Sequence, residues 1–79
     1  MDIKVLGTGC PKCKTLEKSV KDVLAENNIL ADFEKIEDIV KIMEYGIMST
    51  PGLVINGKIV SSGRLPSTSE IKSFIDSNL

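Results

Sequence analysis

The sequence has no histidine, no tryptophan and only two cysteines among its 79 residues. Structural zinc sites use sets of four Cys or His ligands, so this chain lacks the side chains for one of its own. Ten basic residues against eleven acidic ones leave a net charge of −1, which indicates neither nucleic acid nor a strongly charged partner. No apolar run approaches the roughly 20 residues that cross a bilayer. We therefore expect no membrane association.

The N-terminal residues Met1–Lys4 also lack the architecture of a secretory signal peptide. We therefore expect a cytoplasmic protein, and in that compartment a lone C-x-x-C pair is more often catalytic or metal-binding than structural. A disulfide within four residues closes almost no loop, so it adds little to stability. Apolar packing must hold the fold, and 42% of the residues are hydrophobic. A chain of this length predicts a single domain, residues 1–79, which we expect to be a monomer.

Hydrophobic periodicity and turn-forming residues predict seven secondary-structure elements. Asn56-Gly57 is the preferred pair for a two-residue hairpin turn. Ser67 and Glu70 have the spacing of a capping box, which marks the start of the last helix. The expected elements are a strand at 3–6, a helix at 11–26, a strand at 32–35, a helix at 37–45, strands at 53–55 and 58–60, and a final helix that follows Ser67 and extends to Leu79.

This β-α-β-α-β-β-α order predicts an α/β fold with a four-stranded mixed sheet and helices on both faces. The first βαβ unit must be right-handed, with its two strands parallel, and the hairpin adds two antiparallel strands. Ile39, Val40 and Met43 recur at the helical spacing that predicts the second helix. We expect Met43 and Met48 to fill gaps in the core, with a place on the surface beside Pro51 as the alternative for Met48.

The two cysteines, in the segment Cys10-Pro11-Lys12-Cys13, lie where the first helix begins. Proline is favoured at the first helical position, which predicts Cys10 as the N-cap. Unpaired backbone NH groups there favour a thiolate, and Lys12 and Lys14 add positive charge. We expect the pKa of Cys10 to lie below the free value of about 8.5, which would make Cys10 the nucleophile in disulfide exchange. Cys13, one turn further in, suits the resolving role. The alternative, two buried thiols with a purely apolar role, would be favoured for a lone cysteine but is disfavoured for C-P-x-C between a strand and a helix.

Four segments, T-G-C-P-K-C, Y-G-I-M-S-T-P, V-I-N-G-K and S-G-R-L-P-S, resemble the thioredoxin/glutaredoxin superfamily. The chain is most similar to its smallest members, the small redox-active disulfide proteins of archaea and bacteria, over essentially its whole length. The resemblance implies a thioredoxin-like fold and a thiol–disulfide oxidoreductase that needs no cofactor or metal. It reduces disulfide-containing proteins through Cys10 and Cys13, and a thioredoxin-reductase-type or other donor supplies electrons. The resemblance also implies a cis bond before Pro51, which packs against the cysteines. Thr50 offers its backbone to a bound substrate, and Met48 belongs to the same surface.

The sequence departs from the family pattern at several positions. Gly9 stands where thioredoxins have tryptophan, and Lys4 stands where they have a buried acid, six residues before the first cysteine. Lys4 is either a modulator of the pair or a lysine whose head group reaches solvent. Gly63-Arg64 replaces the glutathione-binding turn of glutaredoxins, which leaves glutathione binding open; Arg64 either binds a carboxylate or is a solvated turn residue. Gly7 and Gly9 are expected to allow the sharp turn into the helix.

Two other functions use the same pair of cysteines. Small copper carriers also place C-x-x-C between a strand and a helix, and soft thiolates suit Cu(I). Those carriers usually have methionine where this chain has Thr8. Their element order is β-α-β-β-α-β, so the predicted final helix argues against them. A redox-regulated binding module, whose disulfide switches a partner without turnover, is also compatible with the sequence.

Overall fold

The computed structural model describes all 79 residues and has the predicted order of elements. The elements are β1 (Asp2–Leu6), α1 (Pro11–Glu26), β2 (Asp32–Ile36), α2 (Ile39–Glu44), β3 (Gly52–Ile55), β4 (Lys58–Ser62) and α3 (Thr68–Asp76). No helix of the chain combines the length and apolarity needed to span a membrane.

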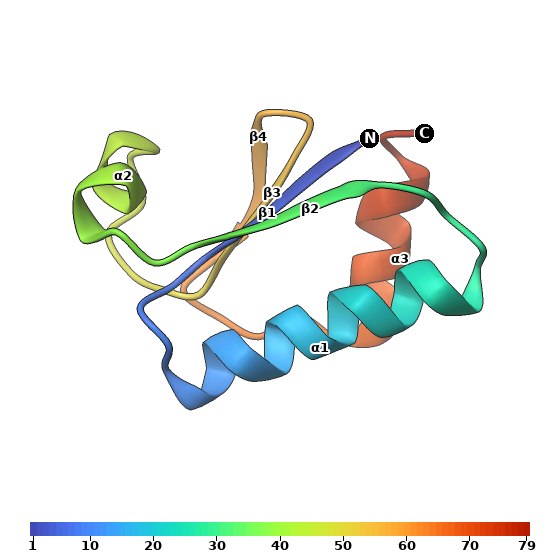
Figure 1. Cartoon of the computed structure of the whole chain (residues 1–79), viewed down its shortest axis with the longest axis horizontal. Helices are drawn as coiled ribbons and strands as arrows, with labels where there is room; N and C mark the ends of the chain where they lie inside the picture. Colours follow the sequence, from blue (N-terminus) through green and yellow to red (C-terminus); the bar gives the residue numbers. More distant parts are fainter.

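The four strands form one mixed sheet in the order β2-β1-β3-β4. The central strand β1 pairs parallel with β2 and antiparallel with β3, and β3 pairs antiparallel with β4. The helices α1 and α3 lie together on one side of the sheet, and α2 lies on the other side (Figure 1). The predicted α/β fold with helices on both faces is therefore confirmed. The order of these elements also differs from the β-α-β-β-α-β order of the copper carriers.

Local turn and cap signals are realised as the sequence predicts. Asn56 and Gly57 both have positive φ, 51° and 80°, as a type I′ hairpin turn requires. The Ser67 side chain accepts a hydrogen bond from the Glu70 backbone at 3.2 Å, and the Glu70 carboxylate accepts one from the Ser67 backbone at 3.1 Å. The last helix ends at Asp76, earlier than predicted, and the Asn78 side chain donates to its final turn at the carbonyl oxygen of Phe74.

Apolar side chains form two separate clusters, one on each side of the sheet. The larger cluster lies between the sheet and the helices α1 and α3, and it contains Ile3, Val5, Leu16, Val20, Val23, Leu53, Ile55, Ile71 and Ile75. The smaller cluster lies beneath α2 and contains Leu6, Ile36, Ile42, Ile47 and Val54. The alternation of side chains along β1 and β3 divides their residues between the two clusters.

The second helix differs most from its prediction. Asp38 caps it by accepting a hydrogen bond from the backbone of Val40 at 2.9 Å, so the helix begins at Ile39. Only Ile42 is buried, whereas Ile39, Val40 and Met43 are 54%, 61% and 65% exposed. With Ile42 facing the sheet, its neighbour Met43 is rotated away by about 100°.

The prediction that Met43 and Met48 fill gaps in the core is therefore wrong. Met48 is completely exposed in the loop after α2. A six-residue helix makes fewer than two turns, so one inward side chain is all that α2 contributes to the small cluster.

Candidate active site

Cys10 is the N-cap of α1, as the sequence predicts. Its backbone is extended, with φ −66° and ψ 160°, and Pro11 takes the first turn of the helix. The backbone NH of Cys13 donates to the Cys10 sulfur at 3.1 Å. The two cysteines form a disulfide in this structure, with their Cα atoms 5.0 Å apart. The Cys10 sulfur thus accepts a hydrogen bond from one of the backbone NH groups that have no partner within the first turn of α1.

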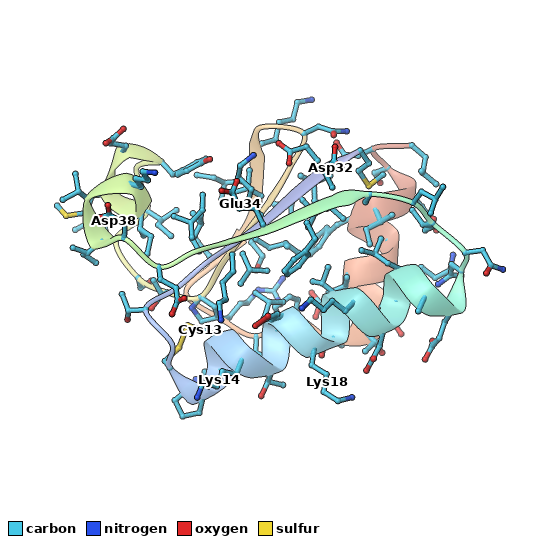
Figure 2. All side chains as sticks on the ribbon, in the orientation of Figure 1. Cys13, Lys14, Lys18, Asp32, Glu34 and Asp38 are labelled. Atoms are coloured by element: carbon cyan, nitrogen blue, oxygen red, sulfur yellow. A yellow bond between two sulfur atoms is a disulfide. The ribbon has the colours of Figure 1, made fainter.

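Cys13 lies beneath Cys10 and is only 3% exposed. Figure 2 shows its side chain turned toward the sheet, while Lys14 and Lys18 lie on the outer side of α1. Gly7 packs against it: a Cβ atom on Gly7 would collide with the Cys13 sulfur and come within 2.9 Å of the Cys13 Cβ. Gly7 therefore gives the buried cysteine its room, a role that the turn prediction did not include. Gly9, with φ of +90°, does serve the turn.

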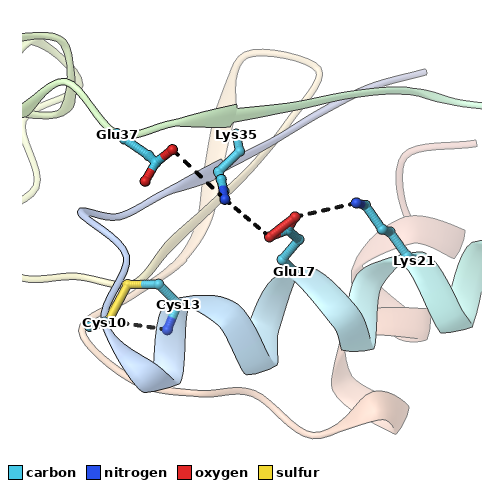
Figure 3. Close-up of polar contacts among 6 residues, drawn as sticks. All are labelled: Cys10, Cys13, Glu17, Lys21, Lys35 and Glu37. Carbon is cyan, nitrogen blue, oxygen red and sulfur yellow. Dashed lines mark hydrogen bonds and ion pairs between the residues drawn. A yellow bond between two sulfur atoms is a disulfide. The ribbon is translucent and has the colours of Figure 1, made fainter.

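A group of charged side chains lies beside the cysteine pair (Figure 3). The ammonium of Lys35 lies 3.5 Å from the Glu17 carboxylate and 3.7 Å from that of Glu37. The Lys21 ammonium hydrogen-bonds to Glu17 at 3.3 Å and is the main reason that the pKa of Glu17 is lowered. A Cβ on Gly9 would lie 3.6 Å from the Glu37 carboxylate, so this acid lies next to the residue before Cys10.

Sequence reasoning missed this group of charged residues. Glu17 belongs to α1, whereas Lys35 and Glu37 come from β2 and the loop that follows it. Only the packing of α1 on the sheet brings them together. The Glu17–Lys21 pair has the (i, i+4) spacing of a helix, but spacing along the sequence carried no signal for the contact between Lys35 and Glu17.

Lys4 does not take the place of a buried acid beside the cysteines. Its neighbours Ile3 and Val5 face α1, so the alternation along β1 directs Lys4 to the α2 side. There it hydrogen-bonds to Asp2, and this bond is the main reason that the pKa of Lys4 is raised. Its side chain is 21% exposed, which agrees with a lysine whose head group reaches solvent. On the same side, Tyr45 packs against the small cluster.

The Thr50–Pro51 step lies at the same end of the sheet as the cysteines. Leu6 at the end of β1 pairs with Gly52 at the start of β3. The next residues outward along these antiparallel strands are Gly7, which packs against Cys13, and Pro51. The peptide bond before Pro51 is cis, as the resemblance implies, and Pro51 is buried.

The loop between β4 and α3 borders this step. The Gly63 backbone donates to the Pro51 carbonyl at 2.9 Å. A side chain on Gly63 would meet the Ser49 hydroxyl, so the two loops touch. Arg64 pairs with Glu70 of its own chain at 2.8 Å, and that carboxylate raises the pKa of Arg64. The carboxylate that Arg64 binds is thus internal.

The other predicted site residues fall in two places. Lys12 is exposed in the first turn of α1, close in sequence to both cysteines. Thr50 is half-buried and Met48 fully exposed in the loop that leads to β3. Neither the NH nor the carbonyl of Thr50 bonds to another group of the protein.

Comparison with known proteins places the chain in a family. Residues 1–76 match the model of a thioredoxin domain family. A thioredoxin of Methanothermobacter thermautotrophicus is 40% identical over 75 residues, which cover 95% of this chain and 97% of that protein. A thioredoxin of Methanocaldococcus jannaschii is 39% identical over 77 residues, covering 98% of this chain and 88% of the relative. The chain is therefore a member of the thioredoxin family of thiol–disulfide oxidoreductases.

Proposed function

We propose that this protein reduces disulfide bonds of other proteins, with Cys10 as the nucleophile and Cys13 as the resolving cysteine. The observation that carries the assignment is the asymmetry of the pair. Cys10 lies at the helix N-terminus and accepts a backbone hydrogen bond, whereas Cys13 is 3% exposed. An external disulfide reaches Cys10 first, and Cys13 is placed to attack only what has bound there.

The reaction is two successive thiol–disulfide exchanges. The Cys10 thiolate attacks one sulfur of the substrate disulfide, forms a mixed disulfide and releases the other substrate sulfur as a thiolate. The Cys13 thiol then loses its proton to solvent and attacks the Cys10 sulfur. This step forms the Cys10–Cys13 disulfide and releases the second substrate thiolate. Two electrons have passed to the substrate, and a dithiol or reductase donor returns them.

The support for substrate binding at Thr50 is its unpaired backbone. The NH and carbonyl of Thr50 have no partner within the protein, so both groups are free to bond to water or to a substrate. An extended substrate segment can supply both bonds by pairing as a short strand. Pro51, held by the bond from Gly63, fixes this backbone at the cysteine end of the sheet. Met48 precedes Thr50 on the same loop.

The test uses single-cysteine variants and a disulfide-containing protein such as insulin. Cys10→Ser is expected to abolish reduction. Cys13→Ser is expected to stop after the first exchange and to accumulate a mixed disulfide, detected as a mass increase that dithiothreitol reverses. The double variant is the control and should form no adduct. Normal turnover by Cys13→Ser would disprove the two-cysteine mechanism. Disulfide-dependent partner binding without turnover would identify a switch module instead.

The N-cap position makes a separate expectation for Cys10. The ultraviolet thiolate absorbance of reduced Cys13→Ser should titrate with a pKa below the free value of about 8.5, because the backbone NH groups of α1 favour the anion. A titration above that value would remove the proposed activation of the nucleophile.

A further inference from the structure

Four side chains beside the cysteine pair form a chain of alternating charge (Figure 3). Its members, in order, are Glu37, Lys35, Glu17 and Lys21. The Lys35 ammonium lies 3.7 Å from the Glu37 carboxylate and 3.5 Å from the Glu17 carboxylate. The Lys21 ammonium lies 3.3 Å from the other oxygen of Glu17. The charge chain is neutral as a whole, but its four members lie at different places relative to the cysteines.

The acidic end of the charge chain is the end that faces the cysteine pair. The Glu37 carboxylate lies 3.6 Å from the position of a Cβ atom on Gly9, the residue before Cys10. Lys21 lies at the other end, eight residues beyond Cys13, which is a rise of about 12 Å along α1. Figure 3 shows this arrangement, with Glu37 above the disulfide and Lys21 further along the helix.

The inner members of the charge chain are partly shielded from solvent. The side chains of Glu17 and Lys35 are 20% and 35% exposed. Charges near the protein interior act on their neighbours more strongly than fully solvated charges do. Lys4, which stands where thioredoxins have an acid, is directed to the other side of the sheet. The acids beside the cysteines therefore come from α1 and from the loop after β2.

We propose that the balance between Glu37 and Lys35 sets the stability of the Cys10 thiolate and thereby the reduction potential of the cysteine pair. A negative charge disfavours a nearby thiolate, and a positive charge favours it. A less stable thiolate makes the dithiol form less favourable, which lowers the potential and strengthens the protein as a reductant. Glu37 thus acts in the reducing direction, and Lys35 moderates it. This inference rests on the proposed function and adds the residues that tune it. Neither residue touches the substrate, because both act through the Cys10 sulfur.

Other charged groups at this end of the molecule also act on Cys10. They are the exposed Lys12 and Lys14 in α1, Asp38 at the start of α2, and Arg64 with its partner Glu70. They stay the same when only Glu37 or Lys35 is replaced. A comparison of such variants therefore isolates the effect of the charge chain.

The test uses two substitutions that remove a charge and nearly keep the length of the side chain, Glu37→Gln and Lys35→Met. In the Cys13→Ser background, ultraviolet thiolate absorbance follows the titration of Cys10. Glu37→Gln should lower the pKa of Cys10, with an acid dissociation constant about 2- to 3-fold larger. Lys35→Met should raise the pKa of Cys10, with a dissociation constant about 2- to 3-fold smaller.

The potential is measured with both cysteines present. Two molecules of reduced glutathione supply two electrons to the Cys10–Cys13 disulfide and leave as oxidised glutathione. The equilibrium constant for this reduction should rise about 2- to 3-fold in Glu37→Gln and fall by about the same factor in Lys35→Met. The double variant should return close to the wild-type value, because the two lost charges have opposite sign.

Glu26→Gln is the matched control. It removes the same charge from the last residue of α1. That residue lies about 24 Å along the helix from Cys10, beyond the screening length of about 10 Å at 0.1 M salt. It should change neither the titration of Cys10 nor the equilibrium with glutathione.

Two results would overturn the inference. Shifts of the same sign in Glu37→Gln and Lys35→Met would show that the ion pairs act only by holding α1 against β2. Shifts no larger than that of Glu26→Gln would show that solvent screens the charge chain completely. Insulin reduction by the wild-type protein tests the proposed function separately. If the wild-type protein reduces no insulin, that function is wrong, even where the two variants shift the equilibrium with glutathione as expected.

Discussion

On one side of the sheet, the 16-residue α1 and the 9-residue α3 bury nine apolar side chains together with β1 and β3. On the other side, the 6-residue α2 shares in a cluster of five. All nine residues of the large cluster are at most 3% exposed, whereas Ile36 and Ile47 of the small one are 9% exposed. The cysteine pair lies at the start of α1, which belongs to the deeply packed side. The exposed apolar residues Ile39, Val40 and Met43 lie on the thinly covered side.

The two sides should contribute unequally to stability. Burial of apolar surface supplies most of the folding free energy, so the α1 and α3 side should carry most of the stability. The α2 side packs less and leaves Ile39, Val40 and Met43 exposed. We expect the nucleophile to be held rigidly by the first side.

The largest expected effect comes from truncating the same residue type on each side. Ile75→Ala removes a fully buried side chain of α3 and should cost about 3–4 kcal/mol, while Ile42→Ala in α2 should cost about 2 kcal/mol, because the thin side relaxes into the cavity. Urea unfolding of the oxidised proteins measures both. Equal losses would mean that the two sides contribute alike.

Two glycines give the next comparison. Gly7→Ala places a methyl group against the buried Cys13 within the disulfide, and it should destabilise the oxidised protein by about 1–3 kcal/mol. Gly52→Ala meets the terminal methyl of Ile47 at 2.8 Å, a flexible group on the thin side, and should cost less than about 1 kcal/mol. Thermal unfolding compares them. If Gly52→Ala lowered the stability of the protein more than Gly7→Ala does, the close packing of Gly7 against Cys13 would be contradicted.

Loss of a helix cap should also cost more stability on the α1 and α3 side than on the α2 side, with smaller effects than the core substitutions. Ser67→Ala breaks the capping box of α3 and should cost about 1 kcal/mol of global stability. Asp38→Ala removes the cap of α2 and should cost about half as much, because a short helix on the thin side frays without unfolding the rest. Hydrogen exchange should show faster opening in residues 39–44 of Asp38→Ala. If Asp38→Ala instead lowered hydrogen-exchange protection across the whole sheet, α2 would unfold together with the rest of the protein.

The smallest effect concerns pH. The pKa of Glu17 is lowered mainly by Lys21 and that of Glu70 mainly by Arg64, both from the usual 4.5. A lowered folded-state pKa stabilises the protein above the usual value, and this contribution is lost as the pH falls through the lowered one. Stability should therefore decline as the pH drops below 4.5, and Glu17→Gln or Glu70→Gln should flatten that decline. Urea midpoints at several pH values measure the slope. An unchanged slope in both variants would show that these pairs are fully screened.

Much of the fold could be predicted because its signals are local. The positive φ values of Asn56 and Gly57 follow from residue types that accept them, and the Ser67 cap needs only a partner three residues away. The N-cap position of Cys10 follows from the strand, turn and proline around it. The predicted start of α2 is two residues too early. The prediction followed the apolar repeat, whereas the Asp38 side chain caps the helix and sets its start at Ile39.

The sequence by itself determined the order of elements, the helix start at Cys10 and the close spacing of the two cysteines, because each depends on residues within a few positions of one another. Only the tertiary structure decided the rest: the contact of Gly7 with Cys13, the place of Lys35 between Glu17 and Glu37, and the outward direction of Ile39, Val40 and Met43. These features depend on how helices and strands pack against each other. An apolar repeat shows that a helix has an apolar stripe, but the area of sheet beneath it decides how much of that stripe is buried.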